Sequence, residues 1–366
     1  MIKRINTYII LLILVLLTNC QNKVKDTVLY SKYNDLFDKA IPVKGKHLKE
    51  QYLSPSSFKC FYLDSAFLGS MPLPNKNIVH LVDLCSGEVT ASAIKNGRGP
   101  GEILSSLPYV DYLNGWLYVG DIATNRIKRV AVKGEKLVTE DFVTIKYSNP
   151  TITAGMEVLS DSLLAIFGYC KNSQNIYLVD KTGIVLDSIK YSLLNDQKID
   201  DSKVSPYYIS MSYHSSNHRL YVYNKTYNHI RIYNIIHNTI ELISHFNLTE
   251  PKYMIKSGKP IQSGKNITLS GEIFLGKDYV YLVANPELRS DFEKRREDAY
   301  SKGITLTAVP DTNSYILIFD YNFNLLKSYL CDSNFSWIAL TEDASIVYAS
   351  DKRNHCLTKY ILEGLE

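Results

Sequence analysis

The sequence predicts an all-β fold: a six-bladed β-propeller with four-stranded antiparallel blades and one helical insert in the fifth blade. Asn-centred turns recur at intervals of about 50 residues, a period typical of propellers and solenoids. Short apolar runs lie between these turns, as β-strands do. The 28 tyrosines also favour strands, because aromatic residues suit the pleated surface of a sheet.

The first 19 residues are expected to be a lipoprotein signal peptide. Two basic residues precede an apolar run from Tyr8 to Leu17, which is too short for a bilayer-spanning helix of roughly 20 residues. Residues 17–20, Leu-Thr-Asn-Cys, resemble a bacterial lipoprotein box, and this implies lipid attachment at Cys20. The alternative is a plain secretory signal. Both versions predict an exported protein.

We expect residues 20–27 to form a tether and residues 28–366 to form a single propeller. Removal of residues 1–19 lowers the formal charge from +4 to +2, because two basic residues and no acidic residue are lost. A nearly neutral chain without a clustered basic face predicts no nucleic-acid partner. No acidic cluster of the kind that resembles a surface-export signal follows Cys20, which favours an outer-membrane or periplasm-facing lipoprotein.

Each repeat is marked by an asparagine before a strand. The six marker positions, separated by 48, 50, 53, 85 and 41 residues, are Asn77, Asn125, Asn175, Asn228, Asn313 and Asn354. Strands before the markers are expected to end in turns at Asp121, Asn224 and Asp351, because Asx side chains bond nearby backbone N–H groups. Two hairpins per repeat make one four-stranded blade.

The strand after the marker ends in an aspartate in several repeats. These aspartates are Asp83, Asp180 and Asp320. A glycine follows in the next turn of several repeats, at Gly87, Gly134 and Gly183. We expect these turns to join the third and fourth strands of their blades.

The 85-residue interval is expected to contain a helical insert at about residues 285–303. Asn285, Pro286 and Gly303 are typical of an N-cap, a first helical turn and a position past the helix end. The helix would carry (i, i+4) ion pairs: Arg289 with Glu293, and Asp291 with Arg295. Long insertions in a repeat often map to the binding face, so we expect this one over or beside a channel mouth. The alternative position is the outer rim.

The last repeat contains only three expected strands. We expect the N-terminal segment, either Val28 to Tyr30 or Ala40 to Val43, to supply the fourth. Ring closure by the opposite terminus would leave no open sheet edge between the first and last blades. The alternative architecture is an irregular pair of β-sandwiches. The absence of a 3.6-residue periodicity outside the insert excludes a helical repeat.

Residues 96–102 read Asn-Gly-Arg-Gly-Pro-Gly-Glu. This G-x-G-P-G-E segment, behind a lipoprotein signal and within a repeat of about 50 residues, resembles the six-bladed β-propeller lipoproteins of Bacteroidetes, a family related in shape to NHL and TolB-like propellers. The resemblance implies a six-bladed, exported and membrane-attached propeller. It implies little about activity, because a fold alone does not give a function.

The loop motif of this segment consists of Gly97, Arg98, Gly99, Pro100, Gly101 and Glu102. Three glycines and a proline make a tight irregular loop. The spacing matches neither the dinucleotide-binding nor the P-loop phosphate motif. We therefore expect a loop that connects two blades, with direct ligand contact as the alternative.

The sequence names no catalytic residue, cofactor or metal ligand. Neither G-x-S-x-G nor H-E-x-x-H occurs. Five histidines gather in the fourth repeat and are expected to be polar surface residues: His214, His218, His229, His237 and His245. Five cysteines remain after Cys20, with neither disulfide-framework nor CxxC spacing. Most of them are expected in strand cores: Cys60, Cys85, Cys170, Cys331 and Cys356.

The leading functional hypothesis is a lipid-anchored envelope β-propeller that acts as a binding or protein-interaction module. Its ligand would be a glycan, a peptide or an envelope protein. The alternative is a propeller enzyme, a hydrolase or lyase acting on glycans or peptides with a bound cation in the channel. Converging acids or histidines at a channel mouth would favour this alternative. A third hypothesis is a structural partner of an envelope protein, which a continuous exposed apolar patch would favour.

Overall fold

The computed structural model describes most of the chain after the predicted tether. The described residues are 27–30, 33–48, 59–63, 66–70, 77–99, 101–105, 109–121, 123–148, 151–170, 173–192, 209–302, 312–341, 343, 345–351, 353 and 356–364. The predicted signal peptide, Cys20 and Pro100 lie outside these residues. The predicted domain boundaries therefore stay predictions.

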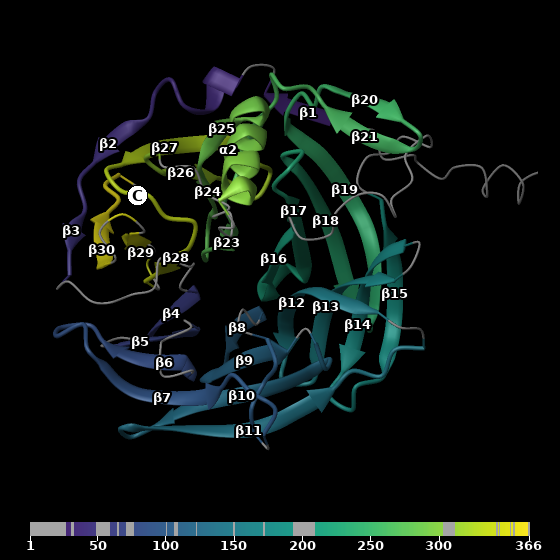
Figure 1. The fold of residues 1–366 in the computed structure, drawn as a ribbon, viewed down its shortest axis with the longest axis vertical. Helices are drawn as coiled ribbons and strands as arrows, with labels where there is room; N and C mark the ends of the chain where they lie inside the picture. The colour runs from purple at the N-terminus through teal and green to yellow at the C-terminus, as the bar shows by residue number, and fades with distance from the viewer. Residues whose placement is uncertain are drawn as a thin grey trace, which may run out of the picture.

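Six sheets, the blades, follow one another around a central axis in chain order (Figure 1). Blade 1 contains β4 (Lys59–Leu63), β5 (Ala66–Ser70), β6 (Asn77–Asp83) and β7 (Val89–Lys95). Blade 2 contains β8 (Tyr109–Leu113), β9 (Trp116–Asp121), β10 (Arg126–Lys133) and β11 (Lys136–Thr144). Blade 3 contains β12 (Ile152–Ser160), β13 (Leu163–Cys170), β14 (Ser173–Asp180) and β15 (Val185–Tyr191).

The second half of the ring has the same plan. Blade 4 contains β16 (Ile209–His214), β17 (Arg219–Asn224), β18 (His229–Ile236) and β19 (Thr239–Thr249). Blade 5 contains β23 (Ile273–Leu275), β24 (Val280–Ala284), β26 (Tyr315–Phe319) and β27 (Leu325–Cys331). Blade 6 contains β28 (Ile338–Leu340), β29 (Ile346–Asp351), β30 (Cys356–Ile361) and the N-terminal strand β3 (Lys46–His47). The predicted six-bladed propeller is confirmed.

The N-terminal segment runs along the outer edges of three blades, and we call it the N-terminal belt (residues 27–30 and 33–48). Strand β1 (Thr27–Tyr30) pairs in parallel with β19 of blade 4. After the short 3-10 helix η1 (Tyr33–Leu36), β2 (Ile41–Val43) pairs in parallel with β27 of blade 5. Strand β3 then pairs antiparallel with β30 and closes blade 6.

The N-terminal segment closes the ring, but the prediction of which residues do so was wrong. Val28 to Tyr30 and Ile41 to Val43 are strands, but they extend blades 4 and 5 rather than complete blade 6. The closing strand is formed by Lys46 and His47. The physical reason is that a short apolar segment can pair with any open sheet edge, so its composition predicts a strand without predicting the partner.

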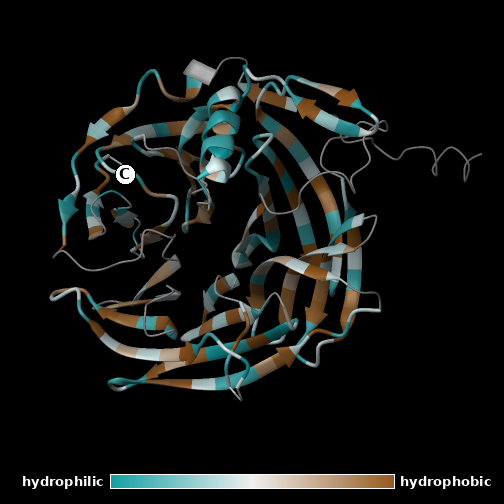
Figure 2. Ribbon diagram, viewed as in Figure 1, coloured by the Kyte–Doolittle hydropathy of each residue, from teal (hydrophilic) through white to brown (hydrophobic). Residues whose placement is uncertain are grey.

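The core consists of six clusters of buried apolar side chains, one between each pair of neighbouring blades. Much of the tyrosine excess lies in the sheets, and the largest fully buried side chains include Tyr118, Tyr191, Tyr221, Tyr223, Tyr233, Tyr281, Tyr329 and Tyr360. Hydrophobic residues run through the strands of the blades (Figure 2). Strands such as β24 and β26 are buried along almost their whole length, whereas exposure alternates along the outer strand β15, where successive side chains point to opposite faces. Interblade packing therefore holds the ring together.

The predicted Asx turns form. The Asp121 carboxylate accepts hydrogen bonds from the Ala123 backbone N–H and the Thr124 hydroxyl, at 3.1 and 2.7 Å. The Asn224 Oδ1 and the Asp351 Oδ1 each accept backbone N–H bonds in the equivalent turns of blades 4 and 6. Not every marker asparagine lies in a turn, however, because Asn175 is within strand β14.

The glycine and aspartate turns between third and fourth strands also form. Gly87, Gly134 and Gly183 all have positive φ, which a glycine adopts without steric cost. Asp83 and Asp180 accept backbone N–H and hydroxyl bonds from the residues that follow them. These bonds lower the pKa of both carboxyl groups.

The insert in blade 5 contains the helix α2 (Arg289–Ser301) between β24 and β26. The predicted N-cap was wrong. Asn285 is buried, and its side chain donates to the Ser270 and Phe335 carbonyls at 2.8 and 2.9 Å. Residues 286–288 form an extended strand, β25 (Pro286–Leu288), which pairs with β22 (Ile267–Leu269) and delays the helix by three residues.

The predicted ion pair between Arg289 and Glu293 is present on α2, and Arg295 pairs with Glu287 at 2.7 Å. Two smaller elements complete the described fold: the hairpin of β20 (Tyr253–Lys256) and β21 (Lys259–Gln262), and the 3-10 helix η4 (Ser215–Asn217). Among the described residues, none of the helices has the length and apolar character needed to cross a bilayer.

Candidate functional site

A cavity of about 90 Å³ lies on the axis of the ring. All six blades line it, with residues from β4, β8, β12, β16 and β23 and with Trp337 just before β28. Pockets that bury drug-sized ligands measure about 300–1,000 Å³. This channel therefore has room for a few waters or a very small ligand, and a sugar chain or peptide cannot enter it in this form.

Polar side chains of the channel join neighbouring blades. The Val158 backbone N–H donates to Asp111 Oδ2 at 2.5 Å and links blades 2 and 3. The Tyr213 N–H donates to Glu157 Oε1 at 2.6 Å and links blades 3 and 4. The Ile273 N–H donates to Ser210 Oγ at 3.1 Å and links blades 4 and 5. These side chains satisfy backbone donors of the adjacent blade, as buried N–H groups require.

Aromatic rings line another part of the channel. Trp337 meets Phe274 edge-on at 4.7 Å between ring centroids, and it meets Phe61 at 6.1 Å. The Trp337 indole N–H donates to the Cys60 carbonyl at 3.1 Å, which joins blade 6 to blade 1. Besides Asp111 and Glu157, the channel lining contains one further carboxylate, Glu272, which forms an ion pair with Lys225. The three channel acids are thus all engaged in structural contacts.

One face of the ring, which we call the connector face, carries the links between blades and the turns between second and third strands. Both emerge on the same side because the four strands of a blade alternate in direction. The G-x-G-P-G-E loop, the turn at Asp121, helix α2 and the turn after Asp351 all belong to this face. In Figure 1, α2 lies within the outline of the ring in front of blade 5. The other face, the hairpin face, carries the remaining turns.

The described part of the Gly97–Glu102 loop folds around its own glutamate. Glu102 Oε2 accepts the Gly99 backbone N–H at 2.6 Å. A Cβ on Gly97 would lie 2.1 Å from this same oxygen, so glycine is needed while the carboxylate holds that position. The loop then continues to Leu104 and Ser105, whose N–H groups donate to the Asp121 carboxylate. This geometry favours a connecting role, and Arg98 is exposed at its outer side.

Helix α2 presents nearly all of its side chains to solvent. Phe292 is the buried residue of the helix, at 5% exposure, and the guanidinium groups of Arg289 and Arg295 lie 4.8 and 5.5 Å from its ring centroid. Tyr300 is 84% exposed. Arg296 forms an (i, i+3) ion pair with Glu293 and is partly exposed. The helix is therefore held by the buried Phe292 and by the ion pair between Arg295 and Glu287, and it offers a charged and aromatic surface.

The surface interpretation was wrong for two of the five histidines. His229 and His245 are buried in blade 4, with ring centroids 5.7 Å apart. Desolvation, aided by the nearby Arg231 cation, lowers the pKa of His229 to about 3. The prediction failed because a strand places alternate side chains on opposite faces. The sequence alone does not show that blade 3 covers the face of β18 and β19 on which these two histidines lie. His218 and His237 are exposed, as expected.

The cysteine prediction is confirmed for most of the five. Cys60, Cys331 and Cys356 are buried in strands, whereas Cys85 is exposed and Cys170 is half-buried, and all five are free thiols. Burial raises the pKa of the Cys60 and Cys331 thiols, so these two stay protonated. Neither can then serve as a thiolate nucleophile near neutral pH.

Sequence reasoning missed the channel residues. Asp111, Glu157 and Ser210 lie on the first strand of three successive blades; Asp111 and Glu157 are near the middle of their strands, and Ser210 is the second residue of β16. A single acidic residue within an otherwise largely apolar strand is the signal that could have identified Asp111 and Glu157, whereas β16 also contains Ser212 and His214 and gives no such signal for Ser210.

The described geometry agrees with comparisons to other proteins. Residues 35–343 match the family model described as TolB-like 6-blade propeller-like. A DUF4221-family protein of Bacteroides vulgatus is 13% identical, with a TM-score of 0.52 and coverage of 88% of this chain and 96% of its own. A Bacteroides fragilis protein named as a candidate exported protein is 11% identical, with a TM-score of 0.51 and coverage of 93% and 98%. No curated protein matches the sequence. The family match covers most of the chain, which therefore belongs to the TolB-like six-bladed propeller family.

Proposed function

We propose that this protein is an exported, lipid-anchored envelope propeller that binds a polypeptide partner through its connector face. Export and anchoring rest on the N-terminal sequence ending at Cys20. A propeller of similar fold from Bacteroides fragilis is also named as a candidate exported protein. Propellers commonly act as rigid binding platforms, and function lies in the sites that they carry.

The observation that carries this proposal is the contrast between the channel and α2. The cavity of about 90 Å³ is too small for a glycan or peptide, and its acids are engaged with backbone N–H groups or with Lys225. These features disfavour the alternative of a hydrolase or lyase in the channel. The connector face instead offers a broad surface with an inserted helix.

Helix α2 is the proposed recognition element. Exposed Tyr300 and Arg296 belong to the residue types that most often dominate the binding energy of protein interfaces. The helix is inserted into a regular repeat, and insertions in repeat proteins often form the binding face. The helix carries four basic and four acidic side chains, so its surface fits a polar segment of a partner better than an apolar one.

Photo-crosslinking in intact cells tests the binding face. A photoreactive phenylalanine derivative placed at Tyr300 is expected to give one dominant protein adduct. The matched control carries the same group at Lys277, an exposed residue in the β23–β24 turn on the hairpin face. Equal adducts from both positions, or none from Tyr300, would contradict the proposed binding face.

The anchor is tested separately. We expect the unchanged protein to sediment with membranes and to be released by detergent, whereas a Cys20→Ala variant is expected in the soluble envelope fraction. Cys85→Ser, a change at an exposed thiol in the ring, is the control and should remain with membranes. Membrane association of both variants would show that lipid at Cys20 is not what holds the protein there.

A further inference from the structure

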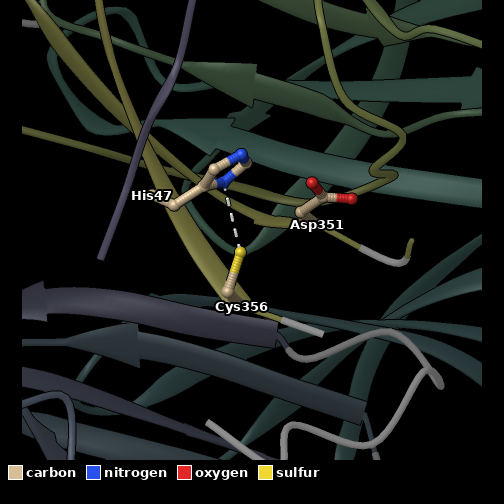
Figure 3. Close-up of side chains that lie close together, drawn as sticks. All are labelled: His47, Asp351 and Cys356. Carbon is tan, nitrogen blue, oxygen red and sulfur yellow. Dashed lines mark hydrogen bonds between the residues drawn. The ribbon is translucent and has the colours of Figure 1, made fainter. Parts of the chain in front are cut away.

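Three metal-ligating side chains meet at the seam where the N-terminal belt closes the ring (Figure 3). His47 is on β3, Asp351 ends β29 and Cys356 begins β30. One possible ligand atom from each residue lies within 4.8 Å of the other two. His47 Nδ1 is 3.3 Å from Cys356 Sγ, although the two residues are 309 positions apart in the chain.

The closure of blade 6 fixes the position of His47. Within β3, His47 is directly opposite Thr358, and its Nδ1 lies 3.0 Å from the threonine hydroxyl. The Leu48 N–H donates to the Leu357 carbonyl at 2.8 Å just after the strand. A Cβ on Gly45 would lie 2.1 Å from Thr358 Cγ2, so the belt approaches β30 too closely for a larger residue. The cluster is therefore built by strand pairing.

We propose that His47, Asp351 and Cys356 bind a zinc ion. An imidazole nitrogen, a carboxylate oxygen and a thiolate sulfur are all zinc ligands. Zinc bonds of about 2.0–2.3 Å place tetrahedral ligand atoms roughly 3.5 Å apart, so the 3.3 Å between Nδ1 and Sγ suits joint coordination. Only small movements would bring the third ligand atom into the same sphere.

Burial and charge also fit this ion. Asp351 and Cys356 are each only 1% exposed, and His47 is on the solvent side and leaves an entry path. A doubly charged cation with one carboxylate, one thiolate and one neutral imidazole has no net charge. That balance suits a mostly buried position, where an uncompensated charge is costly.

The fourth position belongs to the Thr358 hydroxyl or a water. Thr358 Oγ1 lies 3.0 Å from His47 Nδ1 and 3.8 Å from Cys356 Sγ. Binding converts the Cys356 thiol to a thiolate, and its proton is released to solvent. The zinc ion would join β3 of the belt to the last two strands of the chain, so its binding energy would stabilise ring closure.

Calorimetry and cobalt spectroscopy test the site. The purified protein, expressed from Gln21 onwards and treated with a chelator that is then removed, is expected to bind one zinc ion per chain. We expect His47→Ala and Cys356→Ser each to weaken binding at least tenfold. Cobalt(II) in the unchanged protein should give a sulfur-to-metal charge-transfer band, and this band should be absent in Cys356→Ser.

The controls separate this site from surface binding and from misfolding. His218→Ala and Cys85→Ser alter an exposed histidine and an exposed thiol elsewhere, and they should bind zinc as the unchanged protein does. His47 is exposed, so His47→Ala is expected to keep the fold, which circular dichroism checks. Absence of zinc binding by the folded protein, or equal affinity in His47→Ala, would overturn the proposal.

Discussion

Replacing the buried His229 with glutamine is expected to remove part of the acid sensitivity of the fold. The Arg231 Nε–H donates to His229 Nε2 at 3.3 Å, so this nitrogen acts as an acceptor. The proton of the neutral ring is then on Nδ1, which donates to Asn247 Oδ1 at 2.8 Å. Protonation of Nε2 would remove the bond from Arg231 and place two cations side by side in a buried site.

The size of the effect follows from the pKa. His229 has a pKa of about 3 in the folded protein, against 6.5 for an ordinary histidine. Between these two pH values the unfolded chain binds one more proton than the folded chain. The contribution of His229 to the free energy of unfolding is therefore fully present above pH 6.5 and is lost as the pH falls towards 3. At pH 4.5, two pH units below 6.5, the loss is about 3 kcal/mol.

Urea unfolding at pH 7.5 and pH 4.5 measures this loss. The free energy of unfolding of His229→Gln should fall by about 3 kcal/mol less over this interval than that of the unchanged protein. His218→Gln, at an exposed histidine of the same blade, is the control and should behave as the unchanged protein does. An equal pH dependence of His229→Gln and the unchanged protein would refute the reasoning.

Three further changes test the ring itself by urea unfolding at neutral pH. Asp111→Ala removes the acceptor of a buried N–H of blade 3 and should cost about 1–3 kcal/mol; no loss would show that this interblade bond is unimportant. Gly183→Ala should cost more than Gly134→Ala, because both have positive φ but only a Cβ on Gly183 would meet a backbone oxygen, at 2.0 Å; equal losses would contradict this. Trp337→Phe keeps an aromatic ring but loses its N–H bond, so a loss of about 1 kcal/mol is expected, and unchanged stability would argue against that bond.

The sequence predicted those features that depend on local chemistry. Turns at Asp121 and Asn224 form because each side chain bonds backbone groups two or three residues away. The spacing of such turns along the sequence was sufficient to predict a ring of six blades. The N-cap prediction at Asn285 failed although it was local, because this side chain is used instead to tie the insert to the Phe335 carbonyl 50 residues later.

Features that depend on distant partners could not be predicted. Apolar composition identified β1 and β2 as strands but not the blade edges that they cover. Burial of His229 depends on the neighbouring blade, and the meeting of His47 with Cys356 depends on ring closure. In each case the deciding contact joins segments that are far apart in the chain, and the pattern of residue types along the sequence does not show which distant segments pair.

The N-terminal belt determines how the ring would respond to mechanical tension. A pull on the N-terminus reaches β1 first, then β2, and only then the closing strand β3. Strands β1 and β2 lie on the outer edges of blades 4 and 5, so they can detach without opening either blade. A chain pulled from its N-terminus would therefore lose β1 and then β2, and lengthen in two steps, before the closing strand β3 detached and blade 6 opened.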